Sequence, residues 1–178
     1  MKKIWNLLLL FTIIILGFSA CTSESSTKWR DDNLAFFDNL KDKEGIYEIG
    51  DSINGYPGIY YQIITKGTGT IPIVGNVVRV SYAGWLWNDT TTYQSTLSTD
   101  DVFDNMDKYD FTVGTGVIDG WSLVVQHMPV GSEWKVYIPY YLGYGTSASS
   151  AGSGIPAYST LIFDINLKEI VSANSKEN

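Results

Sequence analysis

The stretch that decides the fold is residues 117–139, VIDGWSLVVQHMPVGSEWKVYIP. Residues 117–128 are the main helix candidate in this half of the chain. Asp119 is in position to cap this helix, and Pro129 must end it. Residues 133–139 then alternate between apolar and polar side chains, which is the pattern of a strand with one buried face. We therefore expect a short helix followed directly by a strand.

Three more segments have the composition of strands: residues 59–65, 77–87 and 159–170. In the second, Val78, Val80 and Tyr82 share one face, and the third alternates strictly. The segments between them are rich in glycine or polar residues, and we expect irregular chain or loops at 46–58, 88–101 and 145–154. Strands outnumber helices, so the predicted fold class is α+β with an antiparallel sheet.

A second short helix is predicted before the strands, over residues 31–42. Leu34, Phe37 and Leu40 recur every three residues there, and Gly45 is placed to end the helix. Trp29 and this helix are expected to pack on the domain. The Ser/Thr-rich residues 22–27 have no apolar periodicity, which predicts a flexible tether over about residues 21–30.

The N-terminus has the pattern of a targeting segment. Two lysines precede an almost unbroken apolar run from Leu7 to Gly17, which is short for a membrane span of about 20 residues but suits a signal peptide. Residues 18–21, Phe-Ser-Ala-Cys, resemble the lipobox of bacterial lipoproteins, although Phe18 stands where leucine is usual. Residues 1–20 are thus predicted to be a signal peptide, and Cys21 to be acylated. The alternative is a plain secretory signal with a chance cysteine.

Composition excludes several function classes. The chain has 12 basic and 19 acidic residues, a net charge of −7, without a cluster of basic residues for nucleic acid. Loss of the two lysines in residues 1–20 would leave 10 basic against 19 acidic residues, near −9. One cysteine and one histidine, His127, cannot build a Cys/His zinc site, and we expect neither a metal nor another cofactor.

Six segments carry a more specific signal because they follow one another in a fixed order. They are VSYAG (80–84), VFDN (102–105), FTVG with VIDGW (111–121), QHMPVGSEWKVYIP (126–139), LGYG (142–145) and IPAYSTLIFDI (155–165). Together they resemble the FKBP-type peptidyl-prolyl cis-trans isomerases, over about residues 59–170. The predicted N-terminal helix followed by Ile59-Tyr-Tyr resembles lipoprotein members of that family.

The resemblance implies an FKBP-like antiparallel sheet of about five strands, wrapped around one short helix at 119–127. The isomerase domain would span residues 59–171, after a helix and linker at 31–58 and before a polar tail at 172–178. It also implies an aromatic proline site with Trp121 as its floor and Asp104, held by hydrogen bonds, at its rim. The residues given a catalytic role are Tyr82, Phe103, Asp104, Trp121, Tyr144 and Phe163, and those expected to bind substrate are Phe111, Val117, Ile118 and Ile155.

Three departures from the family pattern bear on the site. Ala157 replaces the second proline of the I-P-P motif, and Gly143 replaces alanine before Tyr144. The stretch between Trp87 and Phe103 is longer than the short turn of the family, so an extra segment would overhang one edge of the site.

The residue types suit prolyl isomerisation, which needs no proton relay. Rotation about a peptide bond is slow because resonance must be lost, with a barrier of about 18–20 kcal/mol. A dry apolar pocket favours the twisted state, in which charge separation falls, and a fixed N–H or O–H can orient the neighbouring carbonyl. By resemblance, the Ile118 N–H and the Tyr144 hydroxyl are these donors. Aromatic residues near the pocket predict a preference for an apolar residue before proline.

Other readings remain open from the residues alone. Each aromatic could be a core or sheet side chain, Asp104 a turn residue and His127 a surface residue. The protein could be a proline-peptide binding module or chaperone with weak turnover. It could also be a surface lipoprotein that holds glycans or a partner through exposed aromatics such as Trp85, Trp87 and Tyr93.

The expected partners follow from these predictions. They are proline-containing polypeptides in exported proteins and a lipid bilayer reached through acylated Cys21, with the macrolide ligands of the family as candidates. The predicted location is the cell envelope, anchored to a membrane and facing the periplasm or the cell surface. We expect a monomer.

Overall fold

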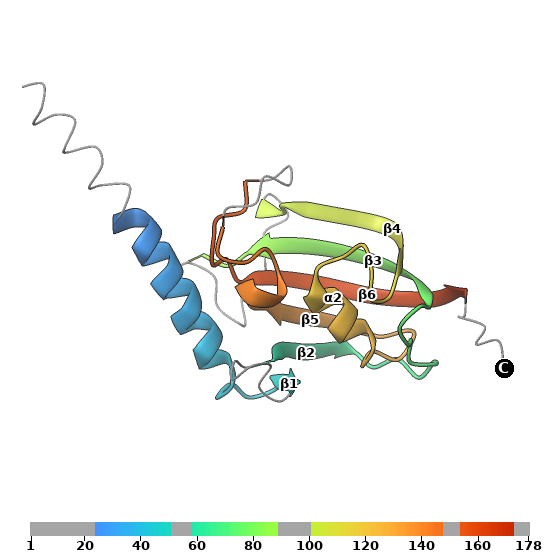
Figure 1. The fold of residues 1–178 in the computed structure, drawn as a ribbon. Coiled ribbons are helices and arrows are strands. Elements are labelled where there is room, and N and C mark those ends of the chain that lie inside the picture. The colour runs from blue at the N-terminus through green and yellow to red at the C-terminus, as the bar shows by residue number, and fades with distance from the viewer. Residues whose placement is uncertain (1–23, 51–57, 89–100, 148–153, 173–178) are drawn as a thin grey trace, which may run out of the picture.

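The computed structural model describes residues 24–50, 58–88, 101–147 and 154–172. A six-stranded antiparallel sheet forms the body of the domain, with the strand order β1-β2-β5-β6-β3-β4 (Figure 1). The strands are β1 (Tyr47–Ile49), β2 (Ile59–Thr65), β3 (Val77–Leu86), β4 (Asp104–Thr112), β5 (Glu133–Ile138) and β6 (Leu161–Ser172). Helix α2 (Asp119–Val125) and the 3-10 turn η2 (Tyr140–Leu142) complete this part of the fold, and a further helix spans residues 24–40.

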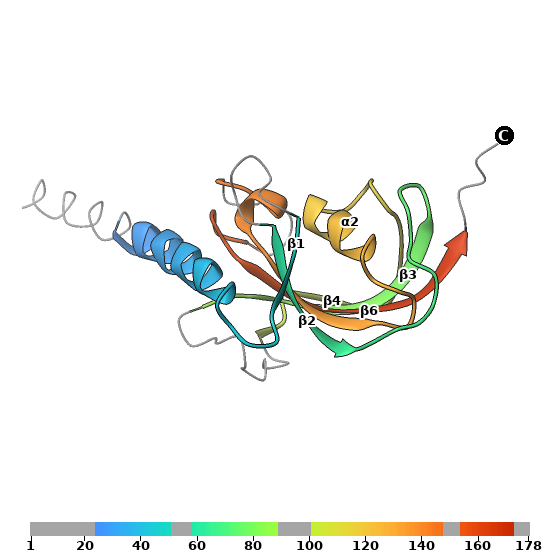
Figure 2. The ribbon, with the colours of Figure 1, turned by 90° about the horizontal axis from the view of Figure 1, so that it is seen from below.

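The predicted α+β class with an antiparallel sheet is confirmed, and α2 lies in the concave side of the curved sheet (Figure 2). The alternation of β6 explains this layering: Leu161, Phe163, Ile165 and Leu167 point toward α2 and are buried. The sheet has one strand more than the five expected, because β1 forms within a stretch predicted to be irregular. Strand β6 also ends at Ser172, one residue into the predicted tail.

Helix α2 forms where the sequence predicts it, but its cap differs. Ile118, with extended backbone, is the N-cap residue and Asp119 lies in the first turn, so the predicted cap at Asp119 is wrong. The helix ends at Val125, two residues before the expected end and well before Pro129. Gly120 lets α2 approach the sheet closely, since a Cβ at this position would lie 2.5 Å from the Ile138 side chain.

The N-terminal helix is longer than predicted. Residues 24–30, expected to be tether, are helical, and Trp29 is partly buried on the domain side as we expected for its packing. The inward face of the helix uses Asn33 and Phe37, whereas Leu34 is 38% exposed, so that part of the predicted apolar face is wrong. Asn33 faces inward because its side chain is a hydrogen-bonding link: its Oδ1 accepts from the Thr160 N–H at 2.7 Å, and its Nδ2 donates to the Trp29 carbonyl at 2.9 Å.

The N-terminal helix covers an aromatic cluster on the convex face of the sheet, which we call the outer cluster. Trp85 and Trp87, 6% and 7% exposed, belong to it, and the Phe36 ring stacks on Trp87 at 4.9 Å. The alternative in which Trp85 and Trp87 form an exposed patch is therefore wrong, and Tyr93 lies outside the described residues. The buried members of the outer cluster are Phe37, Leu40, Tyr60, Trp85, Trp87, Tyr137 and Ile162.

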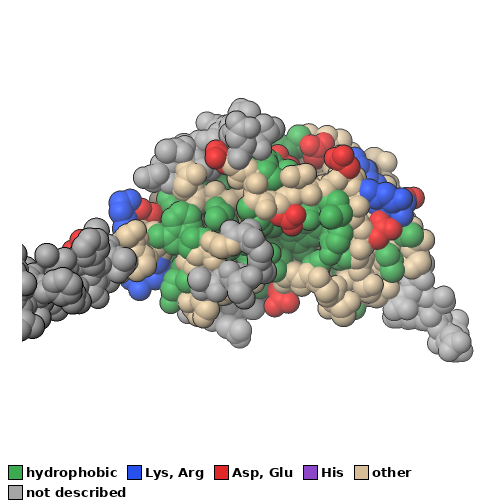
Figure 3. Space-filling model, turned by 90° about the horizontal axis from the view of Figure 1, so that it is seen from above, with side chains coloured by type: hydrophobic (Ala, Val, Ile, Leu, Met, Phe, Trp, Pro, Cys, Tyr) green, Lys and Arg blue, Asp and Glu red, His purple; other side chains and the backbone are tan. Residues whose placement is uncertain are grey.

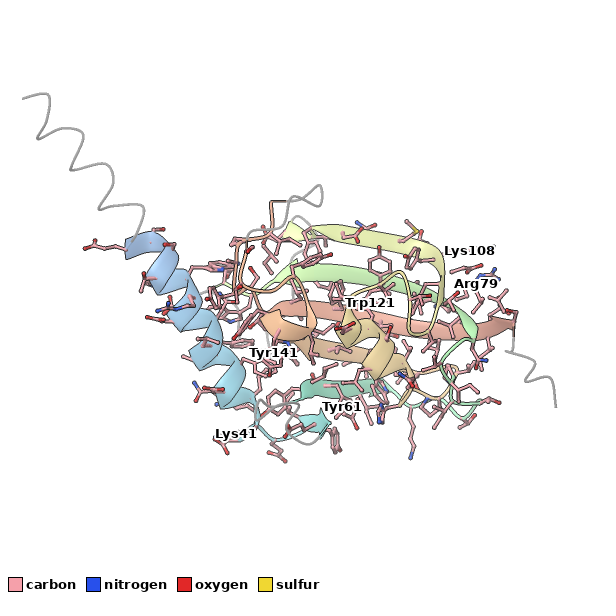
Figure 4. The ribbon with its side chains drawn as sticks, in the orientation of Figure 1. Lys41, Tyr61, Arg79, Lys108, Trp121 and Tyr141 are labelled. Carbon is pink, nitrogen blue, oxygen red and sulfur yellow. The ribbon has the colours of Figure 1, made fainter. Side chains whose placement is uncertain are left out.

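Away from this helix, the convex face carries charged side chains. Arg79 of β3 donates to both oxygens of Asp110 on β4 at 2.7 Å and pairs with Glu169 on β6. Figure 4 shows Arg79 at the opposite end of the sheet from Lys41, which follows the N-terminal helix. The part of the convex face around Arg79 is thus polar, whereas the part under the helix is apolar.

Several predictions concern residues outside the described ranges. These are the signal peptide at 1–20, the acylated Cys21, all but the ends of the 88–101 segment, and the tail beyond Ser172. In the ranges that the structure describes, no helix is both long and apolar enough to cross a bilayer.

Candidate functional site

A cavity of about 600 Å³ opens between α2, the inner face of the sheet and the loop after η2. Figure 3 looks onto the β4 edge of the sheet and shows hydrophobic side chains gathered around a hollow in the middle of this side. Ten residues line the cavity: Tyr82, Asp104, Met106, Tyr109, Gly116, Val117, Ile118, Trp121, Tyr144 and Phe163.

Trp121 forms the floor of the cavity, and Figure 4 shows it between α2 and the sheet. It is only 4% exposed. Its ring meets Tyr82 and Phe163 edge-on, with centroids 4.7 and 5.2 Å away and both interplanar angles at 90°. Edge-to-face contacts of this kind hold an aromatic ring in one orientation. The indole therefore presents a fixed apolar surface to whatever enters.

Gly84 makes room for the wall at Phe163. The two residues are paired across β3 and β6, and a Cβ at Gly84 would lie 2.5 Å from the Phe163 ring. The glycine of the VSYAG segment is thus required by packing, because any side chain would push Phe163 into the cavity. The Phe103 ring also packs on Phe163, with centroids 5.6 Å apart, and it too would crowd a Cβ at Gly84.

Four side chains with polar atoms line the otherwise apolar cavity, namely Tyr82, Asp104, Tyr109 and Tyr144. The Tyr82 hydroxyl donates to the Asp104 carboxylate at 2.8 Å, so Asp104 is held at the rim by a hydrogen bond, as predicted. Burial, together with this hydrogen bond, raises the pKa of Tyr82 above its ordinary value. Burial and the nearby charge of Asp104 likewise raise the pKa of Tyr144. Both hydroxyls stay protonated at neutral pH. The Tyr82 proton is donated to Asp104, whereas the Tyr144 hydroxyl can donate to a ligand.

The chain segment that leads into α2 supplies a backbone hydrogen-bond donor. Gly116 has a φ of +79°, which favours glycine, and the chain then turns so that Val117 and Ile118 line the cavity. Ile118 is the N-cap residue, and its own N–H donates to no protein group in the described ranges. The first N–H groups of a helix have no partner within the helix, so a ligand carbonyl can accept from them.

Seven of the ten predicted site residues line the cavity: Tyr82, Asp104, Trp121, Tyr144, Phe163, Val117 and Ile118. The other three lie behind it. Phe103 packs against Phe163, Phe111 is buried beside Trp121 with centroids 5.6 Å apart, and Ile155 is fully buried in the core. These three support the walls and are not lining residues.

Two lining residues that were not predicted as site residues, Met106 and Tyr109, come from β4. Tyr109 pairs with Val80 and Met106 with Tyr82, so β4 carries one extra residue between the two pairs. Strict alternation would place Met106 and Tyr109 on opposite faces, but such a bulge brings both to the same face. A run of alternating residues gives no signal for the bulge.

The site has the chemistry of an apolar binding pocket. In the described ranges, no group of three or more His, Cys, Asp or Glu side chains could hold a metal ion. His127 is exposed at the end of α2, as predicted, and does not line the cavity. The arrangement can hold an apolar ring against Trp121 and orient a carbonyl by hydrogen bonds at its rim.

The domain is an antiparallel sheet curved around one short helix, with an aromatic pocket beneath that helix. Sequence comparison identifies the protein family that has this architecture. Residues 69–168 match the family described as FKBP-type peptidyl-prolyl cis-trans isomerase, and the chain belongs to this family. The resemblance seen in the six sequence segments is thereby confirmed.

The relatives include bacterial and eukaryotic proteins. The chain is 39% identical over 114 residues to the FKBP-type 22 kDa peptidyl-prolyl cis-trans isomerase of Escherichia coli, a match that covers 64% of this chain and 50% of the relative. It is 36% identical over 143 residues to the outer membrane protein MIP of Legionella longbeachae, covering 78% of this chain and 53% of the relative. The chain thus spans about half the length of these two relatives.

A solved structure supports the fold assignment. The crystal structure of a peptidyl-prolyl cis-trans isomerase from Pseudomonas syringae superposes with a TM-score of 0.63 and 28% sequence identity. The superposition covers 83% of this chain and 94% of that chain. The FKBP-like fold predicted from the sequence is confirmed.

Proposed function

We propose that this protein is a peptidyl-prolyl cis-trans isomerase that accelerates rotation about X–Pro bonds in polypeptides. The observation that carries the proposal is the apolar cavity with the immobilised Trp121 ring as its floor. Family membership supports it, because the matched family and the E. coli relative are both named for this activity.

The cavity favours the twisted imide over the planar one. A pyrrolidine ring that rests on Trp121 leaves water, and with it the solvation that stabilises the polar planar ground state. Tyr82 and Phe163 would hold the ring from the sides, since both meet Trp121 edge-on. The protein supplies shape and dryness, and no bond to a heavy atom is made or broken.

Two donors at the rim would orient the carbonyls next to the proline. The Ile118 N–H and the Tyr144 hydroxyl are the groups that we assign to this role, since both residues line the cavity. Tyr82 would keep the Asp104 carboxylate in one place through their hydrogen bond. Fixed donors cost no reorganisation when the bond twists, so they lower the barrier more than water can.

Met106 and Tyr109 give a further reason to expect that the pocket prefers substrates with an apolar residue before proline. Both line the cavity from β4, and Met106 is 43% exposed at its edge. A flexible thioether beside an aromatic ring adapts to apolar side chains of different shapes. The same cavity is the proposed site for macrolides, since relatives in Dictyostelium discoideum and Neisseria meningitidis are named FK506-binding proteins.

The decisive measurement is the rate of cis-to-trans exchange in short X–Pro peptides. Uncatalysed exchange takes about 10–100 s at 25 °C, so even modest catalysis is visible. We expect the full chain at micromolar concentration to accelerate exchange, most for peptides with an apolar residue before proline. Absence of acceleration across several peptides, with binding retained, would leave a proline-peptide binding module instead.

We also propose that the protein is a lipoprotein of the cell envelope, acylated on Cys21. The basic start, the apolar run and the position of the single cysteine support this. So does the name of the Legionella relative, an outer membrane protein. Two or more acyl chains hold a protein stably on a membrane, whereas an acidic domain gains nothing from anionic lipid.

Metabolic labelling with a fatty-acid analogue tests the anchor. We expect label on the wild-type chain in the membrane fraction and no label on Cys21→Ser. An unlabelled wild type that is secreted after cleavage before Cys21 would overturn the lipoprotein proposal and leave the isomerase proposal standing.

A further inference from the structure

A loop at the end of the domain far from the N-terminal helix exposes large aliphatic side chains. We call residues 70–75, TIPIVG, the aliphatic loop. Ile71, Ile73 and Val74 in it are 47%, 53% and 59% exposed. Residues 67–76 contain no charged side chain, in a chain where 17% of residues are charged. Contiguous apolar surface without charge is typical of interaction sites.

The aliphatic loop is held in place by backbone hydrogen bonds. Asn76, which is buried, accepts from the Ile73 N–H through its side chain at 3.0 Å, and its own N–H donates to the Ile73 carbonyl at 3.0 Å. The Gly75 N–H donates to the Val113 carbonyl at 3.0 Å, and the Val113 N–H returns a bond to Asn76 at 2.9 Å. The exposed side chains therefore stand on a turn that the sheet fixes, so little order is lost when they bind a partner.

The aliphatic loop adjoins the proline pocket. Val74 lies over Gly114, where a Cβ would come within 3.1 Å of the Val74 side chain. Gly116, two residues further, lines the pocket, and two residues of extended chain span at most about 7 Å. Residues 112–118 also carry no charge. The two chain segments that link the exposed side chains of the loop to the pocket wall at Val117 thus carry no charged residue of their own.

We propose that the aliphatic loop is a second contact for the client polypeptide, which binds apolar side chains of an extended chain whose proline occupies the pocket. The inference rests on the proposed isomerase function and names the class of substrate as unfolded, apolar polypeptide. The occupant follows from the continuity with the pocket and from chemistry. The loop offers aliphatic side chains, so it selects a chain by its apolar residues, and a folded protein keeps most of those inside.

This second contact distinguishes long substrates from short ones. A short peptide that fills only the pocket cannot reach Ile73 and Val74. A long unfolded chain reaches both places, and the second contact then forms at the high effective concentration set by the linking residues. Long substrates should therefore gain affinity, and short peptides should not.

The test compares Ile73→Ser/Val74→Ser with the unaltered full-length chain on two substrates. One is a short X–Pro peptide, and the other is an unfolded protein whose refolding is limited by a prolyl bond. Because each half-exposed aliphatic side chain would bury part of its surface, we expect kcat/KM for the unfolded protein to fall by about five- to tenfold. We expect kcat/KM for the short peptide to stay unchanged. Leu34→Ser, at an exposed position on the N-terminal helix, is the matched control and should leave both values unchanged.

The possible outcomes separate the two proposals. Equal loss on both substrates would mean that the loop only supports the pocket, and no loss on either would mean that clients do not touch it. Both results overturn the inference. A concentration-dependent dimer in sedimentation, abolished by the double substitution, would reassign the loop to self-association and also overturn it.

Binding is measured separately, so that the proposed function does not decide the result. Fluorescence anisotropy of a labelled, permanently unfolded polypeptide should show weaker binding to Ile73→Ser/Val74→Ser than to the unaltered chain or to Leu34→Ser. If the unaltered chain lacked turnover on short peptides, the isomerase proposal would fail, whereas this difference in binding would still support the second contact.

Discussion

The two faces of the sheet carry aromatic clusters of similar composition, but one cluster lines an open cavity and the other is covered. On the concave face, Trp121, Tyr82 and Phe163 surround an open cavity of about 600 Å³. On the convex face, the outer cluster is closed by the N-terminal helix, which leaves Trp85 and Trp87 buried. The same strands build both, since Phe163 and Ile162 are neighbours on β6 that point to opposite faces.

The difference shows what turns a group of aromatic residues into a site. In the outer cluster, Phe37 from the helix tilts against Tyr60 at 4.9 Å and fills the space that a ligand would need. In the inner cluster, no side chain of the described residues takes that place, and Tyr82, Asp104 and Tyr144 put polar atoms at the opening. Aromatic composition is common to both faces, whereas an uncovered floor with polar groups at its rim belongs to one.

The largest effects should come from removing one ring from each cluster. Truncating a buried aromatic costs about 3–5 kcal/mol of stability, so Trp121→Ala and Phe37→Ala should each lower the free energy of unfolding by that amount. Only Trp121→Ala should abolish turnover in the molecules that remain folded. Urea unfolding and kcat/KM, measured together at low temperature, check this. Loss of turnover in folded Phe37→Ala would contradict the separation of the two clusters.

The link between the helix and the sheet predicts a smaller loss. Asn33→Ala removes the acceptor of the buried Thr160 N–H, and an unsatisfied buried donor costs about 1–3 kcal/mol. Leu34→Ala, next to it on the exposed side, is the control and should change the unfolding free energy by less than about 0.5 kcal/mol. Chemical unfolding of both variants decides the matter, and similar values for the two would show that Asn33 does not dock the helix.

Substitutions at the rim of the pocket should change activity more than stability. Tyr144→Phe keeps the ring but removes the hydroxyl, a hydrogen bond worth about 0.5–1.5 kcal/mol, or a several-fold loss in kcat/KM. The unfolding free energy should change little, because the ring still packs. If Tyr144→Phe unfolded the protein as strongly as Trp121→Ala, Tyr144 would be a core residue and its place in the site would be wrong.

The smallest effect concerns alkaline pH. Burial raises the pKa of Tyr60, in the outer cluster, from 10.0 to about 12. The unfolded chain therefore releases this proton first as the pH rises, so the stabilisation is complete below pH 10 and is lost between pH 10 and 12. Tyr60→Phe should make the decline in unfolding free energy over this range shallower, as urea titrations at several pH values would show. An unchanged decline would mean that other groups cause it.

Much of the fold and the site could be predicted from local pattern. The alternation of β6 and the position of α2 before Pro129 were correct to within two residues. Seven of the ten predicted site residues line the cavity, because the six ordered segments place them on known elements of the family.

Several of the errors concern which side chain faces which way. Tyr109 lines the cavity and Phe111 lies behind it, although both are aromatic and two residues apart. Asn33 faces inward and Leu34 outward, against their polarity, because the buried Thr160 N–H would otherwise lack an acceptor. Polarity alone cannot reveal a partner that lies 127 residues away along the chain.

The sequence by itself determined the class of fold, the order of its main elements and the set of aromatic residues from which the pocket is drawn. Only the tertiary structure decided which aromatics stay open. The bulge between Met106 and Tyr109 is visible only in the pairing of β4 with β3, and it changes which face each residue occupies. The outer cluster is closed because a helix distant in sequence lies on it. Local pattern reports which faces are apolar, whereas what covers each face depends on contacts between segments far apart in the chain.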